Sequence, residues 1–261
     1  MKRVDLNCDL GESFGNYKCD LDADVIPHIS SANVACGFHA SDPLVMMKTV
    51  ALAKQHGVAV GAHPGYPDLV GFGRRNMSVS VDELKAMVQY QIGALKAFCD
   101  VQGMTLQHVK PHGALYNMAA KDEKIAKAIC LGIYDVSPKL ILMGLAGSEM
   151  LRQAELLGLP AASEVFADRA YEDDGTLVAR SKPGAMIEDE DLAVERVIRM
   201  IRENKVESIS GKEITIRPDS VCVHGDSEKA LLFVKKIRNA LERENISVCD
   251  LKTVLSQHGA L

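Results

Sequence analysis

Short apolar runs alternate with longer segments of helical period along the whole 261-residue chain. The short runs are expected to be strands, at 4–8, 33–36, 58–62, 106–110, 140–143, 162–165 and 221–223. The longer segments are expected to be helices, at 43–56, 81–102, 122–135, 147–157, 190–204 and 227–244. Such alternation is typical of a mostly parallel sheet with helices outside it. The pattern therefore predicts an α/β protein with seven strands.

Local signals place several helix ends. Asp42 precedes Pro43, and Ser80 is followed three residues later by Glu83, which are N-terminal capping patterns. Glycines fall just past three predicted helix ends, where a left-handed residue commonly closes the last turn: Gly57, Gly103 and Gly158. The stretches 167–187 and 205–219 are expected to be long loops or small β excursions. Since no linker divides the chain, residues 1–261 are predicted to form one domain.

Composition narrows the class of protein. Hydrophobic residues make up 47% of the chain and charged residues 25%, as in an ordinary globular protein. The net charge of -5 gives no general attraction to nucleic acid or to an anionic membrane. The amino-terminal stretch turns polar too early for a signal peptide, so a cytoplasmic location is expected. The seven cysteines include no Cys-x-x-Cys pair and are expected to be reduced thiols.

Polar residues interrupt the first predicted strand in a regular way. Asp5, Asn7 and Asp9 are two residues apart and therefore share one face of the strand. An inward row of polar groups is costly unless it serves a site or a hydrogen-bond network. These three residues are therefore predicted to line the inside of the fold.

Other predicted strands end in the same kind of residue. His108, Lys110 and His112 share one face of another strand. Further strand ends carry His39, His63, Asp168, Arg169 and His224. A single histidine at a strand end is more often a structural hydrogen-bonding group than a catalyst. The carboxyl ends of parallel strands lie on one face, however, so this many polar ends predict a shared site.

Eight segments in order along the chain resemble those of the LamB/YcsF family. They are Asp5-Leu-Asn-Cys-Asp-Leu-Gly-Glu12, Ser31-Ala-Asn-Val-Ala-Cys-Gly-Phe-His39, Gly61-Ala-His-Pro-Gly-Tyr-Pro-Asp68, Phe72-Gly-Arg-Arg75, His108-Val-Lys-Pro-His-Gly-Ala-Leu-Tyr-Asn117, Glu164-Val-Phe-Ala-Asp-Arg-Ala-Tyr171, Arg180-Ser-Lys-Pro-Gly184 and Val223-His-Gly-Asp226. The resemblance implies a seven-stranded β/α barrel of the glycoside hydrolase/deacetylase type, in agreement with the strands expected from the pattern.

For function, the resemblance implies the A subunit of a 5-oxoprolinase, which hydrolyses 5-oxo-L-proline to L-glutamate with ATP and the B and C subunits. ATP would be expected with Mg²⁺. The chain has no Gly-x-x-x-x-Gly-Lys-Ser/Thr loop, and its nearest fragment, Ser210-Gly-Lys-Glu213, lacks the hydroxyl residue. The sequence therefore does not locate ATP.

The hypothesis for ring opening assigns roles to residues of these segments. Asp9, with His39 or His63, would activate water, while Lys110 and His112 would stabilise the oxyanion or donate a proton. Arg74, Arg75 or Arg169 would hold the substrate carboxylate, although each fits a structural ion pair equally well. The full set of expected substrate-binding residues is Asn7, Glu12, Arg74, Arg75, Asp168, Arg169 and His224.

Two other functions fit the same residues. A metal-dependent deacetylase would use Asp9, His39 and His63 as ligands of a divalent metal, a plausible carboxylate and imidazole set. A noncatalytic lactam-binding subunit would use the strand ends only to bind its ligand. The enzyme is favoured because more titratable groups converge than a small ligand needs.

Overall fold

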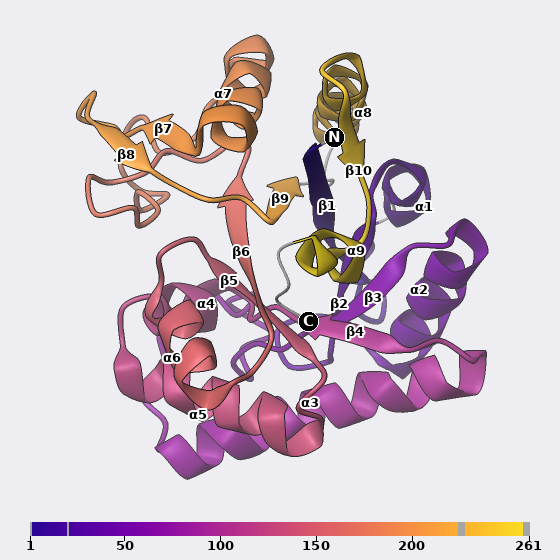
Figure 1. Cartoon of the computed structure of the whole chain (residues 1–261). Coiled ribbons are helices and arrows are strands. Elements are labelled where there is room, and N and C mark those ends of the chain that lie inside the picture. Colours follow the sequence, from indigo (N-terminus) through magenta and orange to yellow (C-terminus); the bar gives the residue numbers. More distant parts are fainter. Residues whose placement is uncertain (1, 20, 224–227, 258–261) are drawn as a thin grey trace.

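The computed structural model describes residues 2–19, 21–223 and 228–257, and it contains a closed barrel of parallel strands (Figure 1). The strands are β1 (Lys2–Leu10), β2 (Ser31–Ala35), β3 (Ala59–His63), β4 (Leu106–Val109), β5 (Ile141–Leu145), β6 (Ala161–Phe166) and β9 (Ser220–Val223). They pair in the order β1-β2-β3-β4-β5-β6-β9, and β1 pairs with β9 to close the ring. The predicted seven-stranded β/α barrel is confirmed.

Helices form the layer outside the strands (Figure 1). The expected helices are present within two residues of their predicted bounds, as α2 (Pro43–His56), α3 (Val81–Gln102), α5 (Glu123–Val136), α6 (Glu149–Leu157), α7 (Glu190–Glu203) and α8 (Glu228–Arg243). The Asp42 side chain accepts hydrogen bonds from the first turn of α2, and Ser80 and Glu83 form a capping box on α3. Capping chemistry therefore fixed these boundaries.

Several short elements were not predicted. They are α1 (Asp22–Val25), the 3-10 helix η1 (Ile26–His28), α4 (Gly113–Ala119), β10 (Ile246–Val248) and α9 (Leu251–Ser256). β10 pairs in parallel with the start of β1, which extends β1 beyond its expected range of 4–8. The expected β excursion in 205–219 is an antiparallel pair, β7 (Lys205–Glu207) and β8 (Glu213–Thr215).

Buried apolar side chains of the described residues form three clusters, and the two described here lie in the barrel. The main core lies between strands and helices and includes Val4, Leu6 and Cys8 from the outward face of β1. A second cluster joins Ile141, Met143 and Ala162 of β5 and β6 to Leu251 and Leu255 of α9. Because Ile141 and Ala162 lie at the starts of their strands, α9 covers the amino-terminal end of the barrel. The carboxyl-terminal end is the one left for a site.

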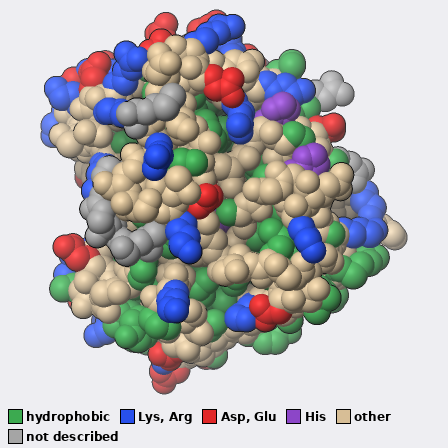
Figure 2. Space-filling model, turned by 45° about the vertical axis from the view of Figure 1, so that its right-hand side comes forward, with side chains coloured by type: hydrophobic (Ala, Val, Ile, Leu, Met, Phe, Trp, Pro, Cys, Tyr) green, Lys and Arg blue, Asp and Glu red, His purple; other side chains and the backbone are tan. Residues whose placement is uncertain are grey.

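Surface charge is mixed on the face that Figure 2 shows, where basic and acidic side chains are interspersed with apolar ones. None of the helices within the described residues combines the length and apolar character that crossing a membrane requires.

Candidate active site in the barrel

A buried carboxylate lies deepest in the polar interior of the barrel. Asp5 accepts hydrogen bonds from Ser30 (2.7 Å), Ser31 (2.6 Å) and Ser220 (2.5 Å). Burial raises the pKa of Asp5 to about 6, although the three hydroxyl groups oppose this shift. Asp5 therefore belongs to a structural network beneath the site.

Amide groups form the next layer of the interior. Asn33 Nδ2 donates to Asn7 Oδ1 at 2.7 Å and to Asp9 Oδ1 at 2.8 Å. The Asn33 Oδ1 atom lies 2.7 Å from Nε2 of His108. Burial, together with nearby Lys110, lowers the pKa of His108 to about 3, so this imidazole is neutral. It therefore donates to Asn33 and serves as a structural hydrogen-bonding group.

Lys110 is the central cation of the site. Its Nζ lies 3.0 Å from Asp9 Oδ1 and 2.7 Å from Glu164 Oε1, and it donates to Asn7 Oδ1 at 3.1 Å. Burial alone would lower the pKa of Lys110, but Asp9, Cys222 and Glu164 raise it well above its ordinary value. Lys110 therefore carries a permanent positive charge.

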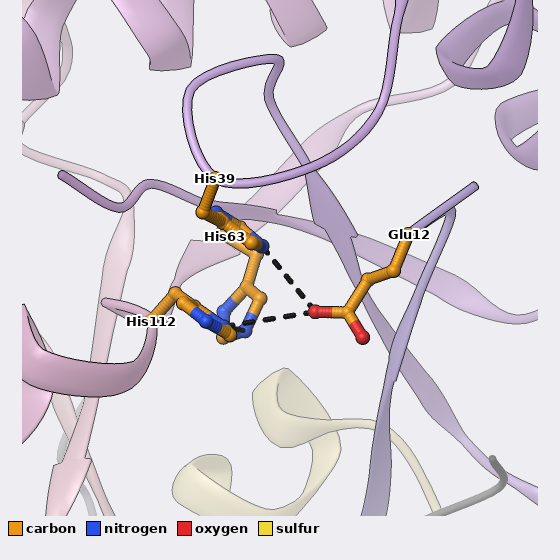
Figure 3. Close-up of side chains that lie close together, drawn as sticks. All are labelled: Glu12, His39, His63 and His112. Atoms are coloured by element: carbon orange, nitrogen blue, oxygen red, sulfur yellow. Dashed lines mark hydrogen bonds and ion pairs between the residues drawn. The ribbon is translucent and has the colours of Figure 1, made fainter. Parts of the chain in front are cut away.

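Three histidines and one carboxylate, from Glu12, meet in one cluster (Figure 3). The rings of His39 and His112 stack with centroids 3.6 Å apart, and the His63 ring is perpendicular to both. Glu12 Oε1 lies 3.3 Å from His39 Nε2 and 3.6 Å from His112 Nδ1. Asp9 Oδ2 lies 3.3 Å from His63 Nε2. Strand ends thus bring together all five predicted catalytic residues, Asp9, His39, His63, Lys110 and His112.

Burial controls the charge of this cluster. It lowers the pKa of His39 and of His112 well below the ordinary value, with His63 adding to both shifts. Burial, and then Asp9, raise the pKa of Glu12. His39 and His112 are therefore neutral near neutral pH.

The loop after β3 holds the cluster in place. Phe72 has a left-handed backbone (φ 53°), and its carbonyl oxygen lies 2.8 Å from His112 Nε2. The Phe72 ring packs edge-on against His39 and His112. The next residue, Gly73, is also left-handed (φ 62°), and an added Cβ would lie 2.7 Å from atoms of both histidines. This loop has room for the stacked rings only because position 73 is glycine.

A cavity of about 590 Å³ opens onto the cluster. Its lining includes Asp9, Glu12, His63 and His112 together with the basic residues Arg74, Lys121, Arg169 and Arg180. Arg169 is almost buried, and its Nη2 donates to the Val178 carbonyl oxygen at 2.6 Å. The cavity therefore combines acid–base groups with cations able to hold an anionic substrate.

The expected substrate-binding residues differ in their positions. Glu12, Arg74 and Arg169 line the cavity, whereas Asn7 lies in the hydrogen-bond network below it. Arg75 pairs with Asp68 on a different surface hollow. Asp168, in the loop after β6, does not line the cavity. His224 lies outside the described residues.

Four residues of the site were not assigned a role from the sequence: Glu164, Asn33, Tyr116 and Phe72. Glu164 is fully buried and accepts a 2.6 Å hydrogen bond from the Tyr116 hydroxyl group. The alternation of β6 was a usable signal, because Glu164 shares a face with the apolar residues Ala162 and Phe166. Phe72 acts through its backbone carbonyl, which no residue pattern reveals.

Acidic, basic and cationic side chains meet at the carboxyl ends of the barrel strands. This arrangement defines the class of protein, which is a β/α barrel with an enzyme-type site. The LamB/YcsF family model matches residues 4–256, and the chain belongs to this family. The resemblance expected from the motifs is therefore confirmed.

Close relatives cover almost the full chain. The protein described as the A subunit of 5-oxoprolinase in Clostridium beijerinckii is 68% identical over 97% of this chain and 100% of its own length. The protein described as the A subunit of 5-oxoprolinase in Bacillus subtilis is 56% identical over 95% of this chain and 96% of its own length. Among solved structures, the lactam utilization protein from Thermus thermophilus is 46% identical in sequence and superposes with a TM-score of 0.90. The match covers 95% of this chain and 99% of the Thermus thermophilus chain.

Proposed function

We propose that this chain is the A subunit of a 5-oxoprolinase and that its barrel opens the lactam ring of 5-oxo-L-proline to give L-glutamate. Full-length relatives described as this subunit of 5-oxoprolinase, at 56–68% identity, are the observation that carries this function. They confirm the type of enzyme subunit that the motifs implied. The B and C subunits are the proposed partners, and a cytoplasmic location stays a prediction.

The site supports a hydrolytic role for the barrel. Water adds to the lactam carbonyl, its proton passes to a base, and the ring C–N bond breaks as the nitrogen gains a proton. Asp9 is the proposed base, because its Oδ2 faces His63 at 3.3 Å and the residue lines the cavity. The His63 Nε2 atom that faces Asp9 carries no proton, because His63 Nδ1 donates to the Lys110 carbonyl oxygen, so Nε2 can accept a proton from Asp9 but cannot donate one to it.

Lys110 is proposed to stabilise negative charge on the carbonyl oxygen. Its raised pKa keeps the ammonium charged, so it acts by electrostatics and not as a proton donor. His112 is neutral and its Nε2 proton is held by the Phe72 carbonyl oxygen, so it does not supply the proton for the leaving nitrogen. The proton that Asp9 takes from water is the proposed source, and Lys110 keeps the electrostatic role alone.

The substrate carboxylate is proposed to bind the basic residues of the cavity. Arg169 is the best placed, because its backbone-bonded guanidinium is nearly buried and its Nε has no hydrogen-bond partner among the described residues. Arg74 lines the same cavity, with its guanidinium 5.1 Å from the centre of the Phe72 ring. Arg75, paired with Asp68 elsewhere, is not part of this proposal.

The described residues of the barrel do not locate a binding site for ATP. The strand ends supply imidazoles and carboxylates, and no glycine-rich phosphate loop precedes a helix in the described ranges. We therefore assign ATP and its Mg²⁺ to the assembled enzyme and derive no step of this chain from them.

The deciding experiment measures glutamate release from 5-oxoproline with ATP and Mg²⁺, using the purified chain alone and mixed with the B and C subunits. Activity in the complete mixture, lost when ATP or this chain is left out, is the expected result. Inactivity of a folded and associated mixture would favour another lactam or the deacetylase function. A noncatalytic lactam-binding role would instead show bound 5-oxoproline and turnover that survives replacement of Asp9.

A further inference from the structure

We propose that Glu12, His39, His63 and His112 form a site for one divalent transition-metal cation of the Zn²⁺ type. This set differs from the one expected from the sequence, because Glu12 and His112 join His39 and His63, and Asp9 lies beside them. The inference concerns the same cavity as the proposed function, but it is tested by binding, so either can fail without the other.

The four ligand atoms have the spacing of a coordination sphere. The separations are 3.0 Å from His112 Nδ1 to His63 Nε2, 3.3 Å from Glu12 Oε1 to His39 Nε2 and 3.6 Å from Glu12 Oε1 to His112 Nδ1. All four atoms lie within 4.8 Å of one another. A tetrahedral zinc site with bonds of about 2.0–2.1 Å has ligand atoms roughly 3.4 Å apart. The cluster therefore surrounds a volume suited to one ion.

Backbone carbonyls fix the tautomers of two histidines. His63 Nδ1 lies 2.7 Å from the Lys110 carbonyl oxygen, and His112 Nε2 lies 2.8 Å from the Phe72 carbonyl oxygen. A carbonyl oxygen only accepts, so each of these nitrogens carries the proton. The opposite nitrogens, His63 Nε2 and His112 Nδ1, then present lone pairs to each other at 3.0 Å. Two facing lone pairs at this distance repel unless a metal ion or a proton lies between them, and outer carbonyl partners are the usual support of metal-binding imidazoles.

His39 is held differently. Its Nε2 faces Glu12, and its Nδ1 has no hydrogen-bond partner among the described residues. The ring is positioned by stacking on His112 and by Phe72. Since no carbonyl fixes its tautomer, we expect His39 to contribute less to metal affinity than His63 or His112.

Donor chemistry selects the class of cation. Three imidazole nitrogens and one carboxylate oxygen suit Zn²⁺ and similar transition metals, whereas Mg²⁺ and Ca²⁺ prefer oxygen ligands. Glu12, His63 and His112 line the cavity, so the ion would have an open side towards a substrate. Asp9 Oδ2, 3.3 Å from His63 Nε2, adds negative charge next to the ion.

One alternative explains the same short contact. A proton shared between His63 and His112 would also relieve the facing lone pairs, without any metal. The two explanations differ in metal content, and only the metal explanation requires Glu12. Binding measurements on matched variants therefore separate them.

The experiment uses the full-length chain, treated with a chelator, dialysed and titrated with Zn²⁺ by calorimetry, with metal content measured after gel filtration. Loading with Co²⁺ gives visible absorption that reports the coordination geometry. We expect one equivalent of metal, and at least about tenfold weaker binding in Glu12→Gln and His63→Asn. Circular dichroism checks folding; should His63→Asn fail to fold, the partly exposed Glu12→Gln variant decides.

Two control variants test other sources of binding. His56→Asn removes an exposed histidine at the end of α2, and Cys19→Ser removes an exposed thiol that lines the cavity. Both are expected to bind Zn²⁺ as the parent chain does. The proposal is overturned if the parent retains no metal, if Glu12→Gln and His63→Asn bind as tightly as the parent, or if either control variant abolishes binding.

Discussion

The Nζ atom of Lys110 lies 2.7 Å from Oε1 of Glu164, and both side chains are closed off from solvent inside the barrel. The same ammonium lies 3.0 Å from Asp9 Oδ1. One cation thus balances two carboxylates in a region where an unpaired charge is costly. This arrangement links the stability of the barrel to the electrostatics of its site.

Replacing Lys110 with Met should destabilise the fold, because it leaves Glu164 buried without its partner. Loss of one member of a buried pair costs about 3–5 kcal/mol. Urea unfolding of Lys110→Met would measure this loss. Lys85→Met is the matched control, since Lys85 pairs with Asp135 at the surface and should change the free energy of unfolding by at most about 1 kcal/mol.

The double variant Lys110→Met/Glu164→Gln tests whether the pair is coupled. Neutral Gln removes the buried charge, so part of the lost stability should return. If the two single-variant losses simply add, the buried pair does not explain the effect of Lys110→Met.

The sequence allowed most of the barrel to be predicted, because capping and alternation act locally. The bounds of α2 and α3 follow from Asp42, Ser80 and the glycines after each helix. β10 and α9 were missed because both are short and owe their place to packing against distant parts of the chain, as Leu251 does against Ile141. Contacts between segments this far apart leave no local pattern.

The same distinction applies to the site. Alternation correctly placed Asp9 and Lys110 inside the barrel, where they form an ion pair. It did not show that Glu12 reaches the histidines, because Glu12 follows β1 in a loop whose course is set by tertiary contacts. The carbonyl of Phe72, which fixes the His112 tautomer, is a backbone feature that side-chain patterns do not reveal.

Asp9→Asn should abolish turnover and leave the fold intact. The Asn oxygen can still accept from Lys110 and Asn33, but the amide is no base. We expect at least about a 100-fold loss in glutamate release by the assembled enzyme, the scale of general base catalysis. Exposed Asp82→Asn is the control; full activity of Asp9→Asn would remove Asp9 from the mechanism.

Gly73→Ala should disturb the histidine cluster by collision. The new Cβ would lie 2.7 Å from atoms of His112 and His39, at a left-handed position. Gly103→Ala is a matched control, because Gly103 has a similar φ of 68° and nothing within 4 Å of an added Cβ. Each should lose about 1 kcal/mol from backbone strain, and only Gly73→Ala should also lose activity. Equal effects on turnover would mean that the cluster tolerates the collision.

Arg169→Gln should raise the KM for 5-oxoproline more than it lowers kcat, because the guanidinium is proposed to hold the substrate carboxylate in both ground and transition states. An increase of at least about tenfold is expected for loss of a charge-assisted hydrogen bond. Arg75→Gln is the control, since Arg75 is paired with Asp68 away from the cavity. A KM effect in Arg75→Gln but not in Arg169→Gln would reverse the assignment.

Asp5 should make stability depend on pH in the mildly acidic range. Its pKa is about 6 in the folded protein, against an ordinary value of 3.8. The folded state therefore holds the proton more tightly, so the stability that Asp5 contributes is full below pH 3.8 and is lost as the pH rises through 6. The shift corresponds to about 3 kcal/mol.

Asp5→Asn removes this titration while its oxygen can still accept from Ser30 and Ser31. Urea unfolding of the parent and of Asp5→Asn between about pH 4 and pH 7 should show the parent losing up to about 3 kcal/mol relative to the variant as the pH rises. Asp82→Asn, at an exposed position, should run parallel to the parent. Parallel curves for Asp5→Asn as well would mean that the serine hydroxyl groups stabilise the ionised carboxylate enough to cancel the effect of burial.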